Sequence, residues 1–451
     1  MLFSSFEFLF RFLPVFLVIY YLTPKKFRNV TLLGGSIVFY TIGEAGYITI
    51  LLACVLVNYT LTRLMYRKNT DGREIRQKRL LLLALGYDLG VLFFFKYSGL
   101  ASGLPLGISF YTFQIMAYVI DVYRGRIPAE QSLLRLGTYL TMFPQLISGP
   151  ITNYADVRVA LGRERTIKAR QLEEGMKLLI IGLAAKVVIA DRIGTLWNSI
   201  RMIGFDSIST KLAWMGAFAY SLQLYFDFAG YSMMARGIGK MLGFELPVNF
   251  RYPYISKSVT EFWRRWHITL GRWFREYVYI PLGGNRKGKA RTFFNLFVVW
   301  SLTALWHGAN YNFLIWGGIL LCCLLVEKLF LLRLLDKSRV IGHLYVLFVV
   351  PLSWVAFAVT DLSELGVYMT RLFPFAGHAA GVINHLDYLK YLNDYAPLFL
   401  LGVLFATPLP ETCYRLIERK WIGRVILLGI FGLCMYYLAV SANNPFLYFN
   451  F

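Results

Sequence analysis

The chain has 451 residues, of which 57% are hydrophobic and 16% are charged, and its mean hydropathy is +0.54. Soluble domains hold roughly 45–50% apolar and about 25% charged residues, so this composition excludes an ordinary soluble domain and indicates a polytopic membrane protein. The formal net charge of +22 does not require a nucleic-acid partner, because membrane proteins collect lysine and arginine in their cytoplasmic loops.

Apolar windows long enough to cross the hydrocarbon layer recur along the whole chain. They fall at 8–23, 30–65, 80–95, 174–190, 211–242, 293–333, 340–358, 396–409 and 423–440. Several can hold two helices, which predicts roughly 10–12 transmembrane helices of about 20 residues each. No convincing repeat or long polar linker separates them, so we expect an all-α fold with a single integral-membrane domain over residues 1–451.

The first two basic loops predict the orientation of the chain. Lys25, Lys26 and Arg28 follow the first window, and seven more bases lie between positions 63 and 79. The turn between these loops, GEAG at 43–46, carries no base. Because basic loops remain in the cytoplasm, both loops belong on that side and the N-terminus is expected outside.

The window at 211–242 contains two intramembrane polar candidates, Asp227 and Tyr231, in the segment LYFDFAGYS. A buried aspartate at membrane depth requires a partner, whereas helix packing alone accounts for a tyrosine. The five cysteines lie in or beside apolar windows with spacings that fit neither a metal site nor a disulfide framework. No metal site is expected.

A charged and aromatic stretch, EFWRRWHITLGRWFREYVYIPLGGNR, occupies 261–286. Wound as one helix, 261–277 sorts its aromatic and charged side chains onto opposite arcs, with His267 on the border. Arginines are costly in hydrocarbon, so this helix is expected to lie in the membrane interface. Residues 251–291 hold ten bases against two acids, which indicates the cytoplasmic side. A simple anchor with solvated arginines is the alternative.

His307 is the second notable histidine, since His343, His378 and His385 suggest no role. It follows Arg291 by 16 residues, or roughly 24 Å along a helix, which passes the midplane of an ~30 Å core. An ionisable residue at that depth indicates function, although a structural histidine remains an alternative. Thr303 and Asn310 supply polar neighbours. A histidine suits a general base for a hydroxyl, and the basic region suits a phosphate-bearing donor.

Several motifs together resemble the membrane-bound O-acyltransferase family, and within it the bacterial alginate O-acetyltransferase-like branch that acetylates polysaccharides. The resemblance covers essentially the whole chain. It rests on the stretch at 261–286, on LWHGANYNFLIWG and on the segments MLFSSFEFLFRFLPVFLVIYY (1–21), LPLGISFYTFQIMAYVIDVYRG (104–125), MFPQLISGPI (142–151), KVVIADR (186–192), LYFDFAGYS (224–232), LPVNFRYPY (246–254) and NPFLYFNF (444–451).

The resemblance implies a ring of transmembrane helices around a thinned centre with a tunnel, together with interfacial or re-entrant helices. It implies that His307 is the catalytic residue and that His267 is its companion. The implied reaction moves an acyl group from a cytoplasmic thioester, acetyl-CoA in this branch, to a hydroxyl of an extracytoplasmic polysaccharide. It also implies a partner of the SGNH-hydrolase type, secreted or membrane-anchored, and a location in the bacterial inner membrane. No bound cofactor is expected.

The sequence departs from the family pattern at Met233, Leu320 and Gly271, where an aspartate, a histidine and a serine are common. None of these is a motif histidine, so activity is expected, with an acceptor site that differs from the usual one.

Binding of the donor is assigned to arginines and tryptophans near the two histidines: Arg264, Arg265, Trp266, Arg272, Arg275 and Trp306. Two alternatives remain: a D-alanyl transferase acting on teichoic acid with a carrier-protein donor, and a transporter of a glycan or lipid-linked sugar.

Overall fold

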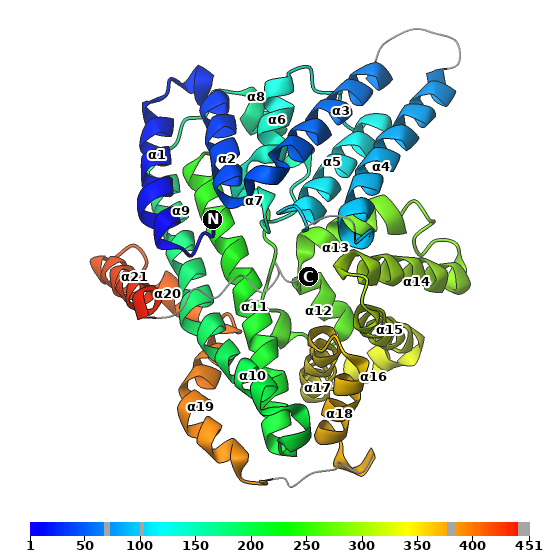
Figure 1. Ribbon diagram of the computed structural model, residues 1–451, viewed down its shortest axis with the longest axis vertical. Helices are drawn as coiled ribbons and strands as arrows, with labels where there is room; N and C mark the ends of the chain where they lie inside the picture. The colour runs from blue at the N-terminus through cyan, green and yellow to red at the C-terminus, as the bar shows by residue number, and fades with distance from the viewer. Residues whose placement is uncertain (67–72, 100–102, 377–383, 441–451) are drawn as a thin grey trace. The chain divides into compact units, whose positions relative to one another are not determined.

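The computed structural model describes residues 1–66, 73–99, 103–376 and 384–440. Within these ranges the fold is all α and contains no strand, as the sequence predicts (Figure 1). The bases Arg67 and Lys68, His378 and the motif at 444–451 lie outside the described residues. The chain divides into two compact units, and the expectation of a single domain over 1–451 stays a prediction.

The first unit comprises Met1–Ile180, Tyr231–Val248 and Arg275–Tyr277. Its centre is aromatic: the Phe143 ring lies 5.2 Å from that of Phe16 and 5.3 Å from that of Phe39. The helices of this unit are α1 (Leu13–Leu22), α2 (Arg28–Glu44), α3 (Ile48–Tyr66), α4 (Arg73–Tyr97), α5 (Ile108–Tyr123), α6 (Leu133–Thr141), α7 (Phe143–Leu146), α8 (Tyr154–Gly162) and most of α9 (Ala169–Ala184).

The second unit comprises Ile181–Gly230, Asn249–Phe274 and Val278–Phe451. In it, α15 packs against both α14 and α17. Its helices are α10 (Asp191–Ile203), the first part of α11 (Thr210–Met241), α12 (Val259–Arg265), α13 (Ile268–Phe274), α14 (Gly288–His307), α15 (Tyr311–Val326), α16 (Leu332–Leu335), α17 (Arg339–Ala358), α18 (Leu362–Leu372), α19 (Asp387–Phe405), α20 (Leu409–Arg415) and α21 (Trp421–Val440).

Five segments of the described chain are long and apolar enough to cross a membrane: Lys25–Tyr66, Glu74–Tyr97, Tyr311–Leu335, Arg339–Ala358 and Trp421–Val440. A sixth is possible if α19 and α20, which meet at a bend of 69°, form one broken span. The windows at 174–190 and 211–242 form helices as expected. They carry Lys186 and Asp227 and are not among these segments, so the expected total of 10–12 stays a prediction.

Two side chains fix the start of α12, which leads into the candidate site. The Ser258 hydroxyl accepts the backbone N–H of Glu261 at 3.0 Å. The buried carboxylate of Glu327 accepts the N–H groups of Val259 and Thr260 at 2.6 and 2.9 Å. A carboxylate at this position satisfies the unpaired N–H groups and complements the positive end of the helix dipole.

Candidate functional site

The helix predicted over 261–277 is broken, so the interpretation of this stretch as one interfacial helix is wrong. The chain forms α12, leaves helical geometry at Trp266 and His267, and continues as α13 and a π-helical turn, Arg275–Tyr279. His267 has a φ of 42°, a left-handed conformation that residues other than glycine rarely adopt. The aromatic arc is buried inside the protein, as the burial of Phe262, Trp266 and Trp273 demonstrates.

Asn249 explains the break, because its polar groups replace the helical partners of the next residues. Its backbone oxygen accepts the N–H of Ile268 at 2.9 Å. Its side-chain oxygen lies 3.1 Å from Nδ1 of His267 and also accepts the N–H and the hydroxyl of Thr269. Since this oxygen is an acceptor for Thr269, Nδ1 of His267 is the donor, and the neutral ring presents Nε2 as an acceptor.

His267 is enclosed by aromatic rings and is only 3% exposed. The Phe228 ring meets it edge-on at 4.7 Å between centroids, and the rings of Phe250 and Trp306 lie 6.4 Å away. Burial lowers the pKa of His267 to about 3, because a charged imidazole loses its hydration there. The seven-residue helices α12 and α13 beside it are too short to cross a membrane.

His307 is the last residue of α14, so the 16 residues from Arg291 form one continuous helix, as predicted. It is 7% exposed and lies in a box of four aromatic rings. Trp306, Trp316 and Phe357 lie at centroid distances of 4.8, 5.0 and 5.0 Å, and Phe313 lies at 6.0 Å. Trp306 therefore adjoins both histidines. Sequence reasoning identified Trp306 but missed the other three rings.

A cluster of tryptophans forms the wall around the two histidines. The ring of Trp354 lies 4.9 Å from Trp266 and 5.9 Å from Trp316, and Trp263 lies 5.0 Å from Trp300. Such large apolar surfaces exclude water and fix one another's orientation. The clustering of tryptophan in the motifs at 261–286 and 300–316 was a usable signal for this wall.

Asn312 holds the α17 side of the His307 box in place, and sequence reasoning missed it. Its buried amide donates to the backbone oxygens of Ala356 and Phe357 at 3.3 and 2.8 Å. Asn310, which the sequence proposed as a neighbour of His307, lies beyond the end of α14 and is exposed. Thr303 is buried on α14, and its hydroxyl donates to the backbone oxygen of Val299 at 2.8 Å.

The arginines assigned to the donor have different surroundings. Arg264 is exposed, whereas Arg265 pairs with Glu261 at 2.8 Å. Arg272 is half-buried on α13. Arg275 is exposed and belongs to the first unit. Trp266 is buried in the tryptophan cluster.

Asp227 has a buried cationic partner, as the sequence predicts for an aspartate at membrane depth. The Nζ of Lys186 lies 2.7 Å from Asp227 and 2.6 Å from Asp191, and the side chains of Lys186 and Asp227 are each 3% exposed. Lys186 comes from the motif KVVIADR, but sequence reasoning did not identify it as the partner. Asp227 directly precedes Phe228 on α11, and the Phe228 ring packs on His267.

Tyr231 belongs to the first unit, where its ring stacks on Phe3 at 4.6 Å. The second unit thus brings together His267, His307, Trp266, Trp306, Thr303 and Asp227. In the described ranges, no group of three or more His, Cys, Asp or Glu side chains has a geometry that would hold a metal ion.

Comparison with known proteins assigns the chain to a family. The family model for membrane-bound O-acyltransferases matches residues 37–340. A probable alginate O-acetylase of Pseudomonas putida is 35% identical, with all of both chains covered. A peptidoglycan O-acetyltransferase of Helicobacter pylori is 29% identical over all of this chain and 98% of its own. A teichoic acid D-alanyltransferase of Bacillus subtilis is 32% identical over 48% of this chain and 58% of its own.

The matched residues include the broken-helix segment, both site histidines and most of the tryptophan cluster. The alternative of a transporter does not agree with this match. The chain belongs to the membrane-bound O-acyltransferase family and is a membrane acyltransferase.

Proposed function

We propose that the chain transfers an acyl group, specifically acetyl, from a cytoplasmic thioester to hydroxyl groups of an extracytoplasmic polysaccharide. Family membership supports acyl transfer, and relatives named alginate O-acetylase and peptidoglycan O-acetyltransferase support a glycan acceptor. The observation that carries the proposal is the pair of buried histidines that adjoin one indole, that of Trp306.

His307 acts as the general base in the proposed reaction. It accepts the proton of an extracytoplasmic acceptor hydroxyl while that oxygen attacks the carbonyl carbon of the thioester. The C–S bond then breaks, and the proton passes from the imidazolium to the leaving thiolate, so the products are an ester and a free thiol. Imidazole suits both proton transfers because a ring nitrogen can accept a proton and then donate it. The aromatic box keeps water, a competing nucleophile, away from the thioester.

His267 has a different role, which is to orient the donor together with Trp306. Its Nδ1–H is directed to Asn249, so Nε2 presents a lone pair. That nitrogen accepts an N–H from the amide-bearing arm of the thioester. Since burial keeps this ring neutral, it adds no positive charge to the path.

The donor is acetyl-CoA in this proposal, and its phosphates bind outside the tryptophan cluster. Arg264 suits them best, because it is exposed, whereas Arg265 is paired with Glu261. Arg272, which is half-buried on α13, is assigned to the same phosphates. Arg275 belongs to the first unit, and its assignment to the donor stays a prediction. Trp266, which is buried, forms part of the wall behind the thioester.

We also propose the location and the partner. The basic loops after the first and second windows support a bacterial cytoplasmic membrane with the N-terminus outside. The likeness to polysaccharide O-acetyltransferases supports a secreted or membrane-anchored protein of the SGNH-hydrolase type that completes transfer onto the glycan.

A D-alanyl transferase is the second candidate. The relative that supports it aligns with 48% of this chain, whereas the alginate O-acetylase of Pseudomonas putida aligns with all of it. The donors also differ, because D-alanine would arrive on a carrier protein. The same assay with the two donors separates these candidates.

The test uses proteoliposomes that hold acetyl-CoA labelled in the acetyl group, with the glycan and the SGNH-type partner outside. We expect label on the external glycan with the wild-type chain and not with His307→Ala. Label that crosses still attached to CoA, or transfer by His307→Ala at the wild-type rate, would overturn the proposal. Circular dichroism of the purified variant serves as the folding control.

A further inference from the structure

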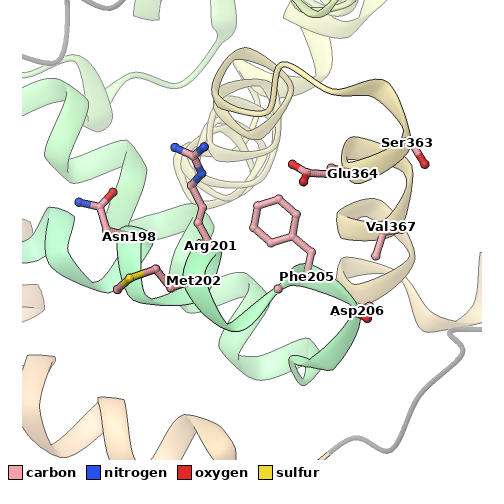
Figure 2. Close-up of a pocket in the computed structure, with 9 residues that line it drawn as sticks. Asn198, Arg201, Met202, Phe205, Asp206, Ser363, Glu364 and Val367 are labelled. Carbon is pink, nitrogen blue, oxygen red and sulfur yellow. The ribbon is translucent and has the colours of Figure 1, made fainter.

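The second unit has an open pocket of about 670 Å³ between the end of α10 and the start of α18. Figure 2 shows Arg201 reaching from α10 and Glu364 from α18 toward one another, with the ring of Phe205 between them. The rest of the lining is Asn198, Met202, Gly204, Asp206, Ser363 and Val367. This volume suits one or two rings of a small polar ligand.

The floor of the pocket is rigid because buried groups hold it. The buried guanidinium of Arg371 donates to the backbone oxygens of Phe205 and Asp206. The Tyr368 ring meets Phe205 edge-on at 4.8 Å, and its hydroxyl donates to the backbone oxygen of Ala213 at 2.7 Å. On the α18 wall, the Asp361 carboxylate caps the helix by accepting the N–H groups of Ser363 and Glu364.

The bordering segments indicate the side of the membrane on which the pocket opens. Residues 203–209, 359–364, 373–376 and 384–387 contain no lysine or arginine, and they contain Asp206, Asp361, Glu364 and Asp387. Loops without bases are typical of the extracytoplasmic side. A pocket there faces the side on which the proposed acceptor lies.

The pocket is also close to His307 along the chain. Phe357, which packs on His307, is followed six residues later by Ser363 in the pocket wall. Six residues extend at most about 20 Å. When one sugar residue of a glycan occupies the pocket, a neighbouring sugar residue of the same glycan is therefore near enough to reach the aromatic box.

The chemistry of the lining favours a neutral sugar. Carboxylates accept hydrogen bonds from adjacent hydroxyls, a guanidinium donates to ring and hydroxyl oxygens, and an amide does both. The Phe205 ring offers an apolar surface to the C–H face of a pyranose. The lining contains two acids, Asp206 and Glu364, and one base, Arg201, so its formal charge is negative. A polyuronate would bring further carboxylates to these acids and be repelled.

We propose that this pocket binds an uncharged sugar residue of the glycan acceptor and thereby selects neutral glycans over polyuronates. The identification of the ligand as an acceptor rests on the proposed function. The competing occupant, a segment of the partner protein, is an outcome of the test.

The test measures binding of cellotetraose and of a mannuronate tetramer to the full chain in detergent micelles by calorimetry. We expect cellotetraose to bind at least tenfold more tightly than the tetrauronate. Glu364→Gln should weaken cellotetraose at least fivefold and strengthen the tetrauronate, and Val367→Trp, which fills the cavity, should abolish both. Asp394→Asn, an exposed acid on α19 that does not line the pocket, should change neither.

Preference for the tetrauronate, no binding of either glycan, or no effect of Glu364→Gln would overturn the proposal. So would a Val367→Trp chain that binds cellotetraose normally but loses copurification with the SGNH-type partner, because the pocket would then be a protein interface. His307→Ala should bind cellotetraose as the wild type does. A wild-type chain that binds cellotetraose but transfers no acyl group would refute the proposed function without refuting the pocket as a sugar site.

Discussion

His267 and His307 both adjoin the Trp306 indole, yet their surroundings differ in kind. His267 is held at a positive φ by a hydrogen bond from Nδ1 to Asn249, and the chain around it is interrupted between two short helices. His307 ends a 20-residue helix and lies among four aromatic rings. The His267 ring has its tautomer fixed by Asn249, whereas the His307 ring has its position fixed by four aromatic rings.

This difference indicates that the two histidines of the site have different roles. A ring whose proton is committed to a structural acceptor and whose pKa is lowered by burial is suited to hold a ligand. A ring in an apolar box at the end of a long helix is suited to exchange a proton with a bound substrate. The following predictions, from the largest effect to the smallest, test that division.

His307→Ala should lower the rate of acyl transfer roughly a thousandfold, since general-base groups contribute about 10²–10⁴. The lost ring leaves an apolar cavity lined by Trp306, Trp316 and Phe357, and such a cavity binds a small ring of matching shape. Added imidazole should therefore restore part of the rate, as measured by label transfer in proteoliposomes. His267→Ala is the matched control, for which imidazole should have no effect. Equal rescue of both variants by imidazole would show that the two histidines do not differ in their roles.

Lys186→Met should destabilise the chain by about 3–5 kcal/mol, because it leaves buried carboxylates without their cation. Asp227 directly precedes Phe228, whose ring packs on His267, so we expect the loss to disturb the surroundings of His267 more than those of His307. Thermal unfolding in micelles measures the loss. The double variant Lys186→Met/Asp227→Leu should recover part of it, as coupled neighbours do. A single variant that melts like the wild type would show that the cluster gives no support.

Asn249→Ala should lower acyl transfer roughly tenfold through the donor KM, because it removes the acceptor that fixes the His267 tautomer. The pH dependence of kcat should stay unchanged, since this ring remains neutral. Steady-state kinetics between pH 5.5 and 8.5 provide the readout. A shift of the acidic limb on mutation would mean that His267 exchanges protons in the reaction.

Arg264→Gln should raise the KM for acetyl-CoA only about two- to threefold, because an exposed cation contributes little in water. The increase should shrink as salt is added. Arg265→Gln, at the neighbouring position, is the control and should act on stability through its pair with Glu261. An unchanged KM for Arg264→Gln would remove this arginine from the donor site.

The sequence predicted the helical class and the two histidines, but it assigned one surface wrongly. The wheel over 261–277 correctly separated the aromatic arc, and Phe262, Trp266 and Trp273 are buried. It assigned that arc to lipid because a wheel does not distinguish lipid from a protein wall. It also assumed a continuous helix, whereas the break at His267 depends on Asn249, 18 positions upstream. The periodicity of residues 261–277 cannot indicate a hydrogen-bond partner that lies outside that window.

The same reason explains the other residues that were missed. Asp227 indicated that a partner exists, but Lys186 comes from a different helical segment, 41 positions earlier. Phe357 reaches the His307 box from α17, 50 positions away. The pocket beside α18 has no motif, because its walls come from segments that only the fold brings together. Contacts between distant segments are thus what the sequence left undetermined.

In the proposed reaction His307 is the general base and His267 orients the donor. The most direct measurement is the single-turnover rate of acetyl transfer at saturating acetyl-CoA for two variants, His307→Gln and His267→Asn. Asparagine tolerates the positive φ of position 267, so this variant should fold and lose only orientation. We predict that His307→Gln is at least about a hundredfold slower than His267→Asn. A His267→Asn chain as slow as His307→Gln, or slower, would contradict the account.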